Sequence, residues 1–264
     1  IPIIFGRDVI HGHHTVYPLP LAMASSFNDE LVKTAYRDIA SEAALDHIHW
    51  TFTPMLDLSR DPRWGRCVES PGEDPYLGSR MAAAMVKGIQ GDKLSDESSI
   101  AACAKHFIGY GLSEGGRDYH HTDVSEPSLH NYYLPAFGAA VKAGVQTVMN
   151  SFNEIGGQPV ASSRYLLTDV LRGELGFDGF VISDWCAIQQ LINHGVAADD
   201  KQAAELALNA GLDMDMVDEC YIKHIADLIE EGRISEETLD NAVRNVLRVK
   251  LRLGLFEHPF APKY

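Results

Sequence analysis

Cysteine is scarce in this sequence, and the few cysteines are not spaced for a metal site or a disulfide framework. The 264 residues contain only four, far apart and without a CxxC pair: Cys67, Cys103, Cys186 and Cys220. Zinc sites usually bring cysteines in closely spaced pairs, and disulfide-stabilised domains are much richer in cysteine. We therefore expect free thiols that act as ordinary structural side chains.

Long hydrophobic runs and an excess of basic residues are also missing. No stretch approaches the roughly 20 apolar residues that a membrane-spanning helix needs. Lys and Arg number 22 against 37 Asp and Glu, which gives a formal net charge of −15 at pH 7. Because this charge repels phosphates, we expect no nucleic acid partner and no membrane partner.

The N-terminal residues show no targeting signal. They read IPIIF over residues 1–5, with neither an initiator methionine nor a basic region ahead of an apolar one. We expect a truncated start, which leaves cytoplasmic, periplasmic and secreted locations all open.

The sequence does contain a regular alternation of short apolar runs and amphipathic segments. At 45% hydrophobic and 22% charged residues it can bury a full core. The apolar runs predict strands at 2–8, 50–58, 101–109, 147–152, 180–184 and 212–216. The segments between them predict helices at 29–45, 74–88, 128–143, 164–174 and 201–209. Strands separated by helices of this length indicate βαβ crossovers and a parallel sheet.

Two α/β architectures share this order of elements. A doubly wound sheet that binds a dinucleotide would show a GxGxxG turn after a strand, and the sequence has none. A (β/α) TIM-type barrel fits the length of the chain as one domain. Six strands are visible, two short of a closed barrel, so we expect an incomplete TIM-type barrel with about six strands.

The C-terminal part predicts two further helices. Ile222, Ile225 and Ile229 recur at helical spacing, and Gly232 ends that run. Ser235 is then expected to cap a last helix that is acidic at its start and basic at its end, which matches the helix dipole.

Polar side chains follow most of the apolar runs. Charged or hydrogen-bonding residues at or after strand ends are Arg7, Asp8, His11, Asp57, Asp61, Arg63, Arg66, Lys105, His106, Asn150, Ser151, Asp184, Asp213 and Asp215. Since the carboxyl ends of barrel strands meet at one face, we expect many of these to converge. Carboxylates and cations beside an exposed ring such as Trp185 suit a sugar better than a phosphate, which the carboxylates would repel.

Several motifs resemble glycoside hydrolase family 3. Residues 180–185 (FVISDW), preceded by 169–177 (DVLRGELGF), resemble its nucleophile signature. Further matches are 6–12 (GRDVIHG), 61–66 (DPRWGR) with Glu69 and Ser70, 105–107 (KHF) and 115–119 (GGRDY). The resemblance extends over essentially the whole chain in the family's own order, and it is closest to the β-glucosidase branch.

The resemblance implies that residues 1–264 are the N-terminal barrel domain of a retaining, exo-acting β-glycosidase. Such an enzyme hydrolyses terminal non-reducing β-D-glucosyl residues through a covalent glycosyl-Asp intermediate, with no metal or cofactor. Asp184 matches the nucleophile, and the matching substrate-binding residues are Asp8, Arg66, Lys105, His106, Met149 and Trp185. Phe152 lies where many members carry Tyr, so one hydrogen bond near the nucleophile is expected to be missing.

One component of the mechanism is not found in the chain. In β-glucosidases of this family the acid/base Glu usually lies in a following α/β sandwich domain, which is absent here. A second domain or chain is therefore expected to supply it, with homo-oligomerisation as an open alternative. A β-glucoside or cello-oligosaccharide is the favoured substrate, and xylose and N-acetylglucosamine stay open as the sugar.

Three other functions remain as alternatives. A β-N-acetylglucosaminidase of the same family would use an Asp–His dyad on a loop, for which residues 118–123 (DYHHTD) are a loose match. A metal-dependent barrel hydrolase would use His11, His13, Lys105, His106, Asp184 and His194. A non-catalytic sugar-binding module would need no acid/base at all.

Overall fold

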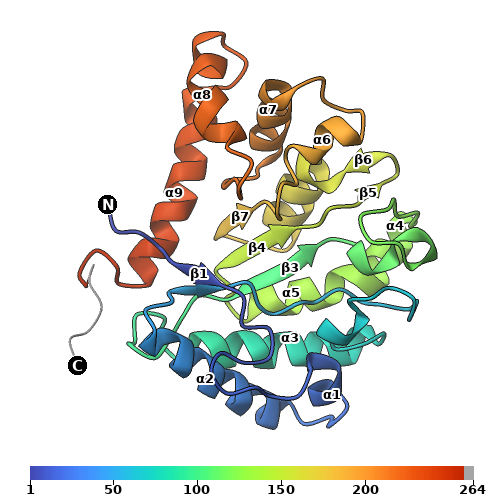
Figure 1. Cartoon of the computed structure of the whole chain (residues 1–264), viewed down its shortest axis with the longest axis vertical. Coiled ribbons are helices and arrows are strands. Elements are labelled where there is room, and N and C mark those ends of the chain that lie inside the picture. Colours follow the sequence, from blue (N-terminus) through green and yellow to red (C-terminus); the bar gives the residue numbers. More distant parts are fainter. Residues whose placement is uncertain (259–264) are drawn as a thin grey trace.

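Parallel strands at the centre of the molecule pair in chain order in this computed structural model, which describes residues 1–258 (Figure 1). Residues 259–264, part of the expected domain, lie outside that range. The parallel strands are β1 (Gly6–Arg7), β2 (Trp50–Thr51), β3 (Cys103–Phe107), β4 (Thr147–Asn150) and β7 (Phe180–Ile182). The expected α/β class with parallel strands is confirmed.

The hydrogen-bonded ladder has six positions and stays open. β1 pairs with β2, a bridge from Trp50 to Ala101 continues toward β3, and β3, β4 and β7 form one sheet. The last position is a single parallel bridge between Ile182 and Met214. Among residues 1–258 no pairing joins Met214 to β1.

The strands are shorter than the apolar runs that predicted them. Run 2–8 contributes only two residues, and Ile3 and Phe5 at its start are exposed. An antiparallel hairpin of β5 (Glu154–Ile155) and β6 (Gln158–Pro159) was not expected. Its two-residue loop is Gly156-Gly157, and both glycines have positive φ, as this kind of hairpin turn requires.

The helices lie outside the strands, with α2, α3 and α5 together on one side and α7 and α8 on the other (Figure 1). Their bounds are α1 (Pro20–Ala24), α2 (Asp29–Leu45), α3 (Pro75–Gln90), α4 (Glu126–Ser128), α5 (Leu134–Lys142), α6 (Gln190–Asn193), α7 (Asp200–Ala210), α8 (Cys220–Glu230) and α9 (Glu236–Arg252). The segments η4 (Leu129–Tyr133) and η6 (Tyr165–Glu174) are π-helical. The 3₁₀ turns are η1 (Cys67–Glu69), η2 (Tyr110–Leu112), η3 (Glu114–Gly116) and η5 (Val160–Ser162). Segment 164–174 is thus helical as expected, but in π form.

Local sequence signals explain the ends and the packing of these helices. Ser235 caps α9 by accepting a hydrogen bond from the Thr238 amide, as expected. Gly88 lets α3 approach α2 closely, because a Cβ there would lie 2.4 Å from the backbone oxygen of Lys33. The predicted apolar face of α8 is wrong in one position: Ile222 is 85% exposed, while Ile225 and Ile229 pack on the core.

The strands separate the two largest apolar clusters of the described residues. The larger lies between the strands and helices α2, α3, α5 and α7. The smaller contains Trp50, Cys103, Met149 and Phe180, and residues of α9 close it. Met149 also reaches the functional pocket described below, so this cluster supports the pocket from beneath.

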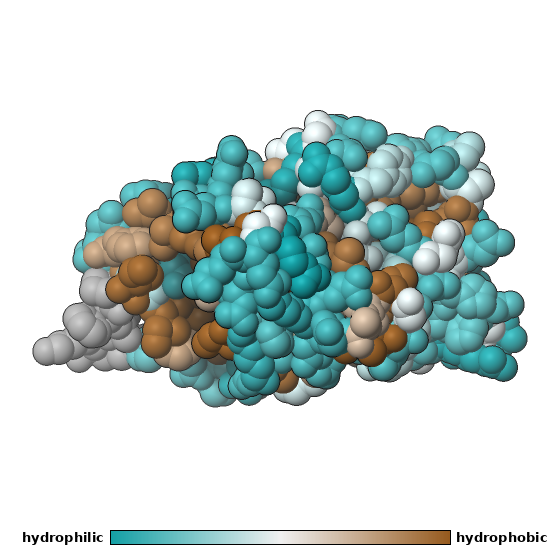
Figure 2. Space-filling view, turned by 90° about the horizontal axis from the view of Figure 1, so that it is seen from above, coloured by the Kyte–Doolittle hydropathy of each residue, from teal (hydrophilic) through white to brown (hydrophobic). Residues whose placement is uncertain are grey.

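The remaining expectations from composition concern the cysteine thiols, membrane-spanning helices and the polarity of the surface. All four cysteines are free, with Cys103 and Cys220 buried. Within the described residues, no helix combines the length and apolar character needed to cross a membrane. The face in Figure 2 is largely hydrophilic, with separate hydrophobic patches between the polar areas.

Candidate functional site

The strand ends bring the expected site residues into one pocket. A pocket of about 360 Å³ is lined by all seven of them together with Phe52 and Met216: Asp8, Arg66, Lys105, His106, Met149, Asp184 and Trp185. This volume lies within the range of small-molecule sites. Residues that are up to 177 positions apart in the sequence (Asp8 and Trp185) thus share one wall.

A larger hollow of about 580 Å³ lies elsewhere and is a weaker candidate. Its lining includes His47, His49 and residues 95–99, which precede β2 and β3. These segments are at the amino ends of the strands, whereas barrel enzymes place their chemistry at the carboxyl ends. We therefore place the functional site in the smaller pocket.

An irregularity in β3 explains how two consecutive residues face the same pocket. Side chains alternate between faces along a regular strand, so Lys105 and His106 would point to opposite sides. The pairing of β3 with β4 shifts register between Ala104 and Phe107. Such irregularities redirect side chains beside active sites, and here both Lys105 and His106 line the pocket.

Lys105 and Asp8 form the first charged pair of the site. Lys105 Nζ donates to Asp8 Oδ2 over 2.6 Å, and the lysine side chain is only 3% exposed while that of Asp8 is 47% exposed. A buried ammonium is strongly unfavourable without a partner. Asp8 therefore supplies the partner that Lys105 needs at the pocket wall, while its own side chain stays partly open to solvent.

His106 is fixed by a buried carboxylate behind it. Its Nδ1 lies 2.7 Å from Asp57 Oδ2, and its amide donates to the same oxygen over 3.0 Å. Burial raises the pKa of Asp57 to about 7 and lowers the pKa of His106 to about 3. The imidazole is therefore neutral near pH 7, and the Asp57 contact leaves its Nε2 directed at Asp184.

Asp184 presents one carboxylate oxygen to that nitrogen. Its Oδ1 accepts the Trp185 amide over 2.7 Å, and its own amide donates to Asn150 Oδ1 over 3.2 Å. Oδ2 lies 3.4 Å from His106 Nε2 and is buried without a hydrogen-bond partner among the described residues. One oxygen is thus held in place while the other is available for a ligand or for bond formation.

Arg66 is held by a carboxylate that does not line the pocket. Its guanidinium donates to both oxygens of Glu69, over 2.8 and 3.0 Å. Burial alone would lower the pKa of Arg66, but Glu69 outweighs that effect and raises it above its ordinary value. The structure thus pairs Lys105 with Asp8 and Arg66 with Glu69.

Aromatic residues support this polar wall from behind. The Tyr110 ring packs edge-on against His106 and Trp64, at centroid distances of 5.1 and 5.2 Å, and the Arg66 guanidinium lies over its face. Phe152 joins this layer at 5.4 Å from Tyr110. These contacts hold Arg66 and His106 in fixed positions.

The open side of the pocket is apolar. Trp185 is 61% exposed and lies at the rim, whereas Met149 is buried at 3%. Phe52 and Met216 complete this side. A face of this kind can cover the C–H groups of a pyranose, while the charged side binds its hydroxyls.

Several polar residues that were expected at the pocket form hydrogen bonds and ion pairs outside it. Asp61 pairs with Arg63, Asp213 accepts from Arg172 and the Val181 amide, and Asp215 accepts the Tyr221 amide. None of them lines the pocket. These residues are structural, because their hydrogen bonds hold loops and strand ends together.

The histidine set of the metal-hydrolase alternative does not assemble. His11 Nδ1 bonds to the Tyr17 carbonyl oxygen, His13 to Asp46, and His194 to the Phe152 carbonyl oxygen and Glu154. Only His106 reaches the pocket. The geometry therefore gives no support to a metal bound by this set together with Lys105 and Asp184.

The loop of the dyad alternative has no Asp–His pair among the described residues. Asp118 accepts a hydrogen bond from Trp64 Nε1 over 2.9 Å, and His120 and His121 instead approach Glu114. No residue of this loop lines the pocket with Asp184.

Sequence reasoning missed part of the site. The sequence indicated Asp57 only as a charge at a strand end. A carboxylate inside the apolar run 54–58 nevertheless indicates that a buried polar group pairs with it. Glu69 was quoted only as part of a motif. Phe52 and Met216 carry no sequence signal, because apolar residues in strands are common in any core.

Comparisons with known proteins point to one family. The sequence model described as "Glycosyl hydrolase family 3 N terminal domain" matches residues 1–249. The periplasmic beta-glucosidase of Salmonella typhimurium is 47% identical over 99% of this chain, and a beta-xylosidase of Formosa agariphila is 40% identical over 94%. The crystal structure of a beta-glucosidase from Listeria innocua in complex with glucose superposes with a TM-score of 0.98, at 48% identity over 100% of this chain.

The relatives are much longer than this chain. The matched region is 34% of the Salmonella protein, 36% of the Formosa protein and 37% of the Listeria chain. The chain thus spans about a third of the length of the proteins it matches.

Proposed function

This chain belongs to glycosyl hydrolase family 3 through its N-terminal domain, and from that premise we propose that it carries the nucleophile and the sugar-binding residues of a retaining, exo-acting β-glycosidase. The observation that carries the proposal is Oδ2 of Asp184, which has no hydrogen-bond partner among the described residues, lies 3.4 Å from His106 Nε2 and belongs to a residue that lines the pocket. A retaining glycosidase needs one ionised carboxylate at the anomeric carbon.

The pocket supplies both kinds of contact that a sugar needs. Lys105 and Arg66 can donate to hydroxyls, and Asp8 can accept from them. The apolar side with Trp185 and Met149 can cover the ring. A phosphate would meet the carboxylates of Asp8 and Asp184, which favours an uncharged ligand.

The proposed reaction has two displacements at the anomeric carbon. Asp184 Oδ2 attacks that carbon, the bond to the leaving oxygen breaks, and a general acid protonates that oxygen. The resulting glycosyl ester is then attacked by water, which gives a proton to the same group acting as base, and the carboxylate leaves. His106 Nε2 lies close enough to orient a hydroxyl or the nucleophile.

The general acid is proposed to come from outside this chain. Among the described residues the pocket is lined by two carboxylates, Asp8 and Asp184, and Asp8 is paired with Lys105. The relatives extend over about three times the matched length, which leaves room for a second domain that bears a Glu. A second copy of the chain is the alternative source.

A terminal β-D-glucosyl residue of a β-glucoside or cello-oligosaccharide is the proposed substrate. Relatives named beta-glucosidase and beta-xylosidase both match over nearly all of this chain, so the choice between glucose and xylose rests on the outer hydroxymethyl group. The polar wall of Asp8, Lys105 and Arg66 favours the sugar with more hydroxyls.

Covalent trapping tests the proposal. The full-length protein is incubated with a 2-deoxy-2-fluoro-β-glucoside that carries a good leaving group, and the label is located by peptide mass mapping. We expect the label on Asp184, no label in Asp184→Ala, and a loss of turnover on the order of 10³-fold or more in that variant. Sugar binding without any label would favour the non-catalytic sugar-binding module.

A further inference from the structure

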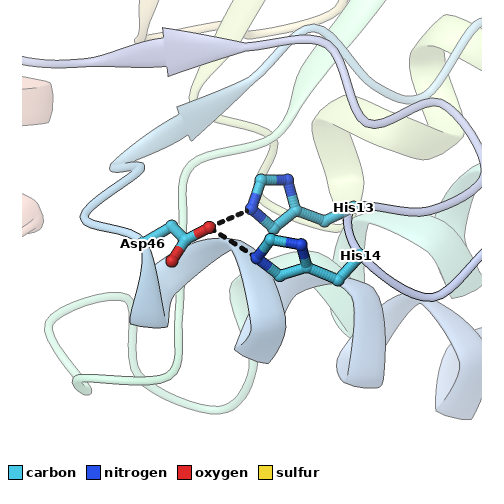
Figure 3. A group of neighbouring side chains, drawn as sticks. All are labelled: His13, His14 and Asp46. Atoms are coloured by element: carbon cyan, nitrogen blue, oxygen red, sulfur yellow. Dashed lines mark hydrogen bonds and ion pairs between the residues drawn. The ribbon is translucent and has the colours of Figure 1, made fainter.

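Two adjacent histidines meet a single carboxylate oxygen outside the sugar pocket. The Nε2 atoms of His13 and His14 each lie 2.7 Å from Oδ2 of Asp46 (Figure 3). The histidines lie between β1 and α1, and Asp46 is the C-cap residue directly after α2. Three potential ligand atoms therefore surround one point, all within 4.8 Å of one another.

The three side chains converge closely. The two imidazole rings lie 4.4 Å apart, centroid to centroid, and both Nε2 atoms approach the same carboxylate oxygen. Two imidazole nitrogens and one carboxylate oxygen are usual donors to a divalent transition metal.

We propose that His13, His14 and Asp46 bind a divalent transition metal of the zinc class. Zn²⁺ accepts imidazole nitrogen and carboxylate oxygen at about 2.0–2.2 Å, in a tetrahedron whose fourth position water can fill. Ligands at those lengths lie about 3.3 Å apart, so each nitrogen–oxygen distance must widen from 2.7 Å. The His14 side chain is 70% exposed and can make this movement.

The surroundings decide the strength and the consequence of binding. Nδ1 of His13 is buried and has no hydrogen-bond partner among residues 1–258. His13 therefore lacks there the outer contact that strengthens many zinc sites, and we expect weaker binding than in a zinc finger. Glu42, one turn earlier on α2, already accepts two hydrogen bonds from Thr15. A metal would add a further link between α2 and the loop that begins at Asp8.

The test measures zinc binding by the full-length protein after treatment with a chelator. Calorimetric titration with ZnCl₂ and thermal unfolding with and without ZnCl₂ are compared in the wild type, His14→Gln and Asp46→Asn. His47→Asn is the matched control, since His47 is exposed and next to Asp46 but outside the cluster. Every variant is repeated with His121→Gln, because Glu114, His120 and His121 form a second group with metal-ligand spacing.

We expect His14→Gln and Asp46→Asn to weaken one zinc site by more than about tenfold, since the loss of an outer-shell partner alone costs about 10–100-fold. Zinc should raise the unfolding temperature of the wild type and of His47→Asn, but not of these two variants. Equal zinc affinity and stoichiometry in the wild type and His14→Gln would overturn the proposal, as would zinc binding that only His121→Gln removes. The sugar-pocket residues take no part in this test.

Discussion

Nε2 of His106 lies 3.4 Å from Oδ2 of Asp184, and both residues line the pocket. The two residues come from neighbouring parts of the sheet, since β3 carries His106 and Asp184 follows β7 across β4. This relationship depends on Asp57, which holds the other side of the imidazole. Asp184, His106 and the buried Asp57 therefore form one connected unit.

Asp57→Asn should reduce catalysis although Asp57 does not line the pocket. Asn keeps the shape but weakens the contact with Nδ1 of His106, so the ring loses its fixed orientation. The loss of a hydrogen bond to a charged group is worth about 1.5–3 kcal/mol, which corresponds to about 10–150-fold in kcat/KM.

Steady-state kinetics with an aryl β-glucoside check this, together with the pH profile of kcat. Asp123→Asn is the control, because Asp123 is exposed on the loop 118–123. It also tests the dyad alternative: a large loss in Asp123→Asn and none in Asp57→Asn would contradict the role of Asp57 as a positioning residue.

Lys105→Met should weaken sugar binding. The substitution keeps much of the volume but removes the ammonium that pairs with Asp8 over 2.6 Å. We expect a loss of about 1.5–3 kcal/mol in the binding of glucose or of a glucose-like inhibitor. Isothermal titration measures it, with the exposed Lys87→Met as control; equal affinities in the two variants would contradict the assignment.

The buried His106 should make folding sensitive to acid. Burial lowers its pKa from 6.5 to about 3, so its contribution to stability is fully present above pH 6.5 and is lost as the pH falls toward 3. Asp57 acts in the opposite direction: burial raises its pKa to about 7, and its contribution is lost as the pH rises from 3.8 to about 7.

His106→Gln removes the first contribution. The free energy of unfolding, measured by urea titration from about pH 4 to about pH 7, should therefore differ between wild type and variant by an amount that grows with pH up to about 6.5. A difference independent of pH would show that His106 titrates in the folded protein as freely as in the unfolded chain.

Gly88→Ala should destabilise the contact between α2 and α3. The added Cβ would lie 2.4 Å from the Lys33 oxygen and 3.0 Å from Tyr36 Cβ, and overpacking of this kind costs about 1–3 kcal/mol. Gly138→Ala in α5 is the matched control, because its Cβ would meet only Leu175, at 3.5 Å. That change should be neutral or stabilise by up to about 1 kcal/mol, and thermal unfolding of both variants measures the contrast.

The sequence by itself determined the order of parallel strands, the capped helices and seven of the nine residues that line the pocket. These features depend on local patterns: apolar runs, capping residues such as Ser235, and motifs at strand ends. Tertiary structure alone decided which charges pair, because partners such as Asp8 and Lys105 are 97 residues apart. It also decided that Asp61 and Asp213 stay away from the pocket while Phe52 joins it, since a side chain's direction depends on register and packing rather than on its neighbours in sequence. The β3 irregularity and the meeting of His13 with Asp46 are likewise products of the folded chain.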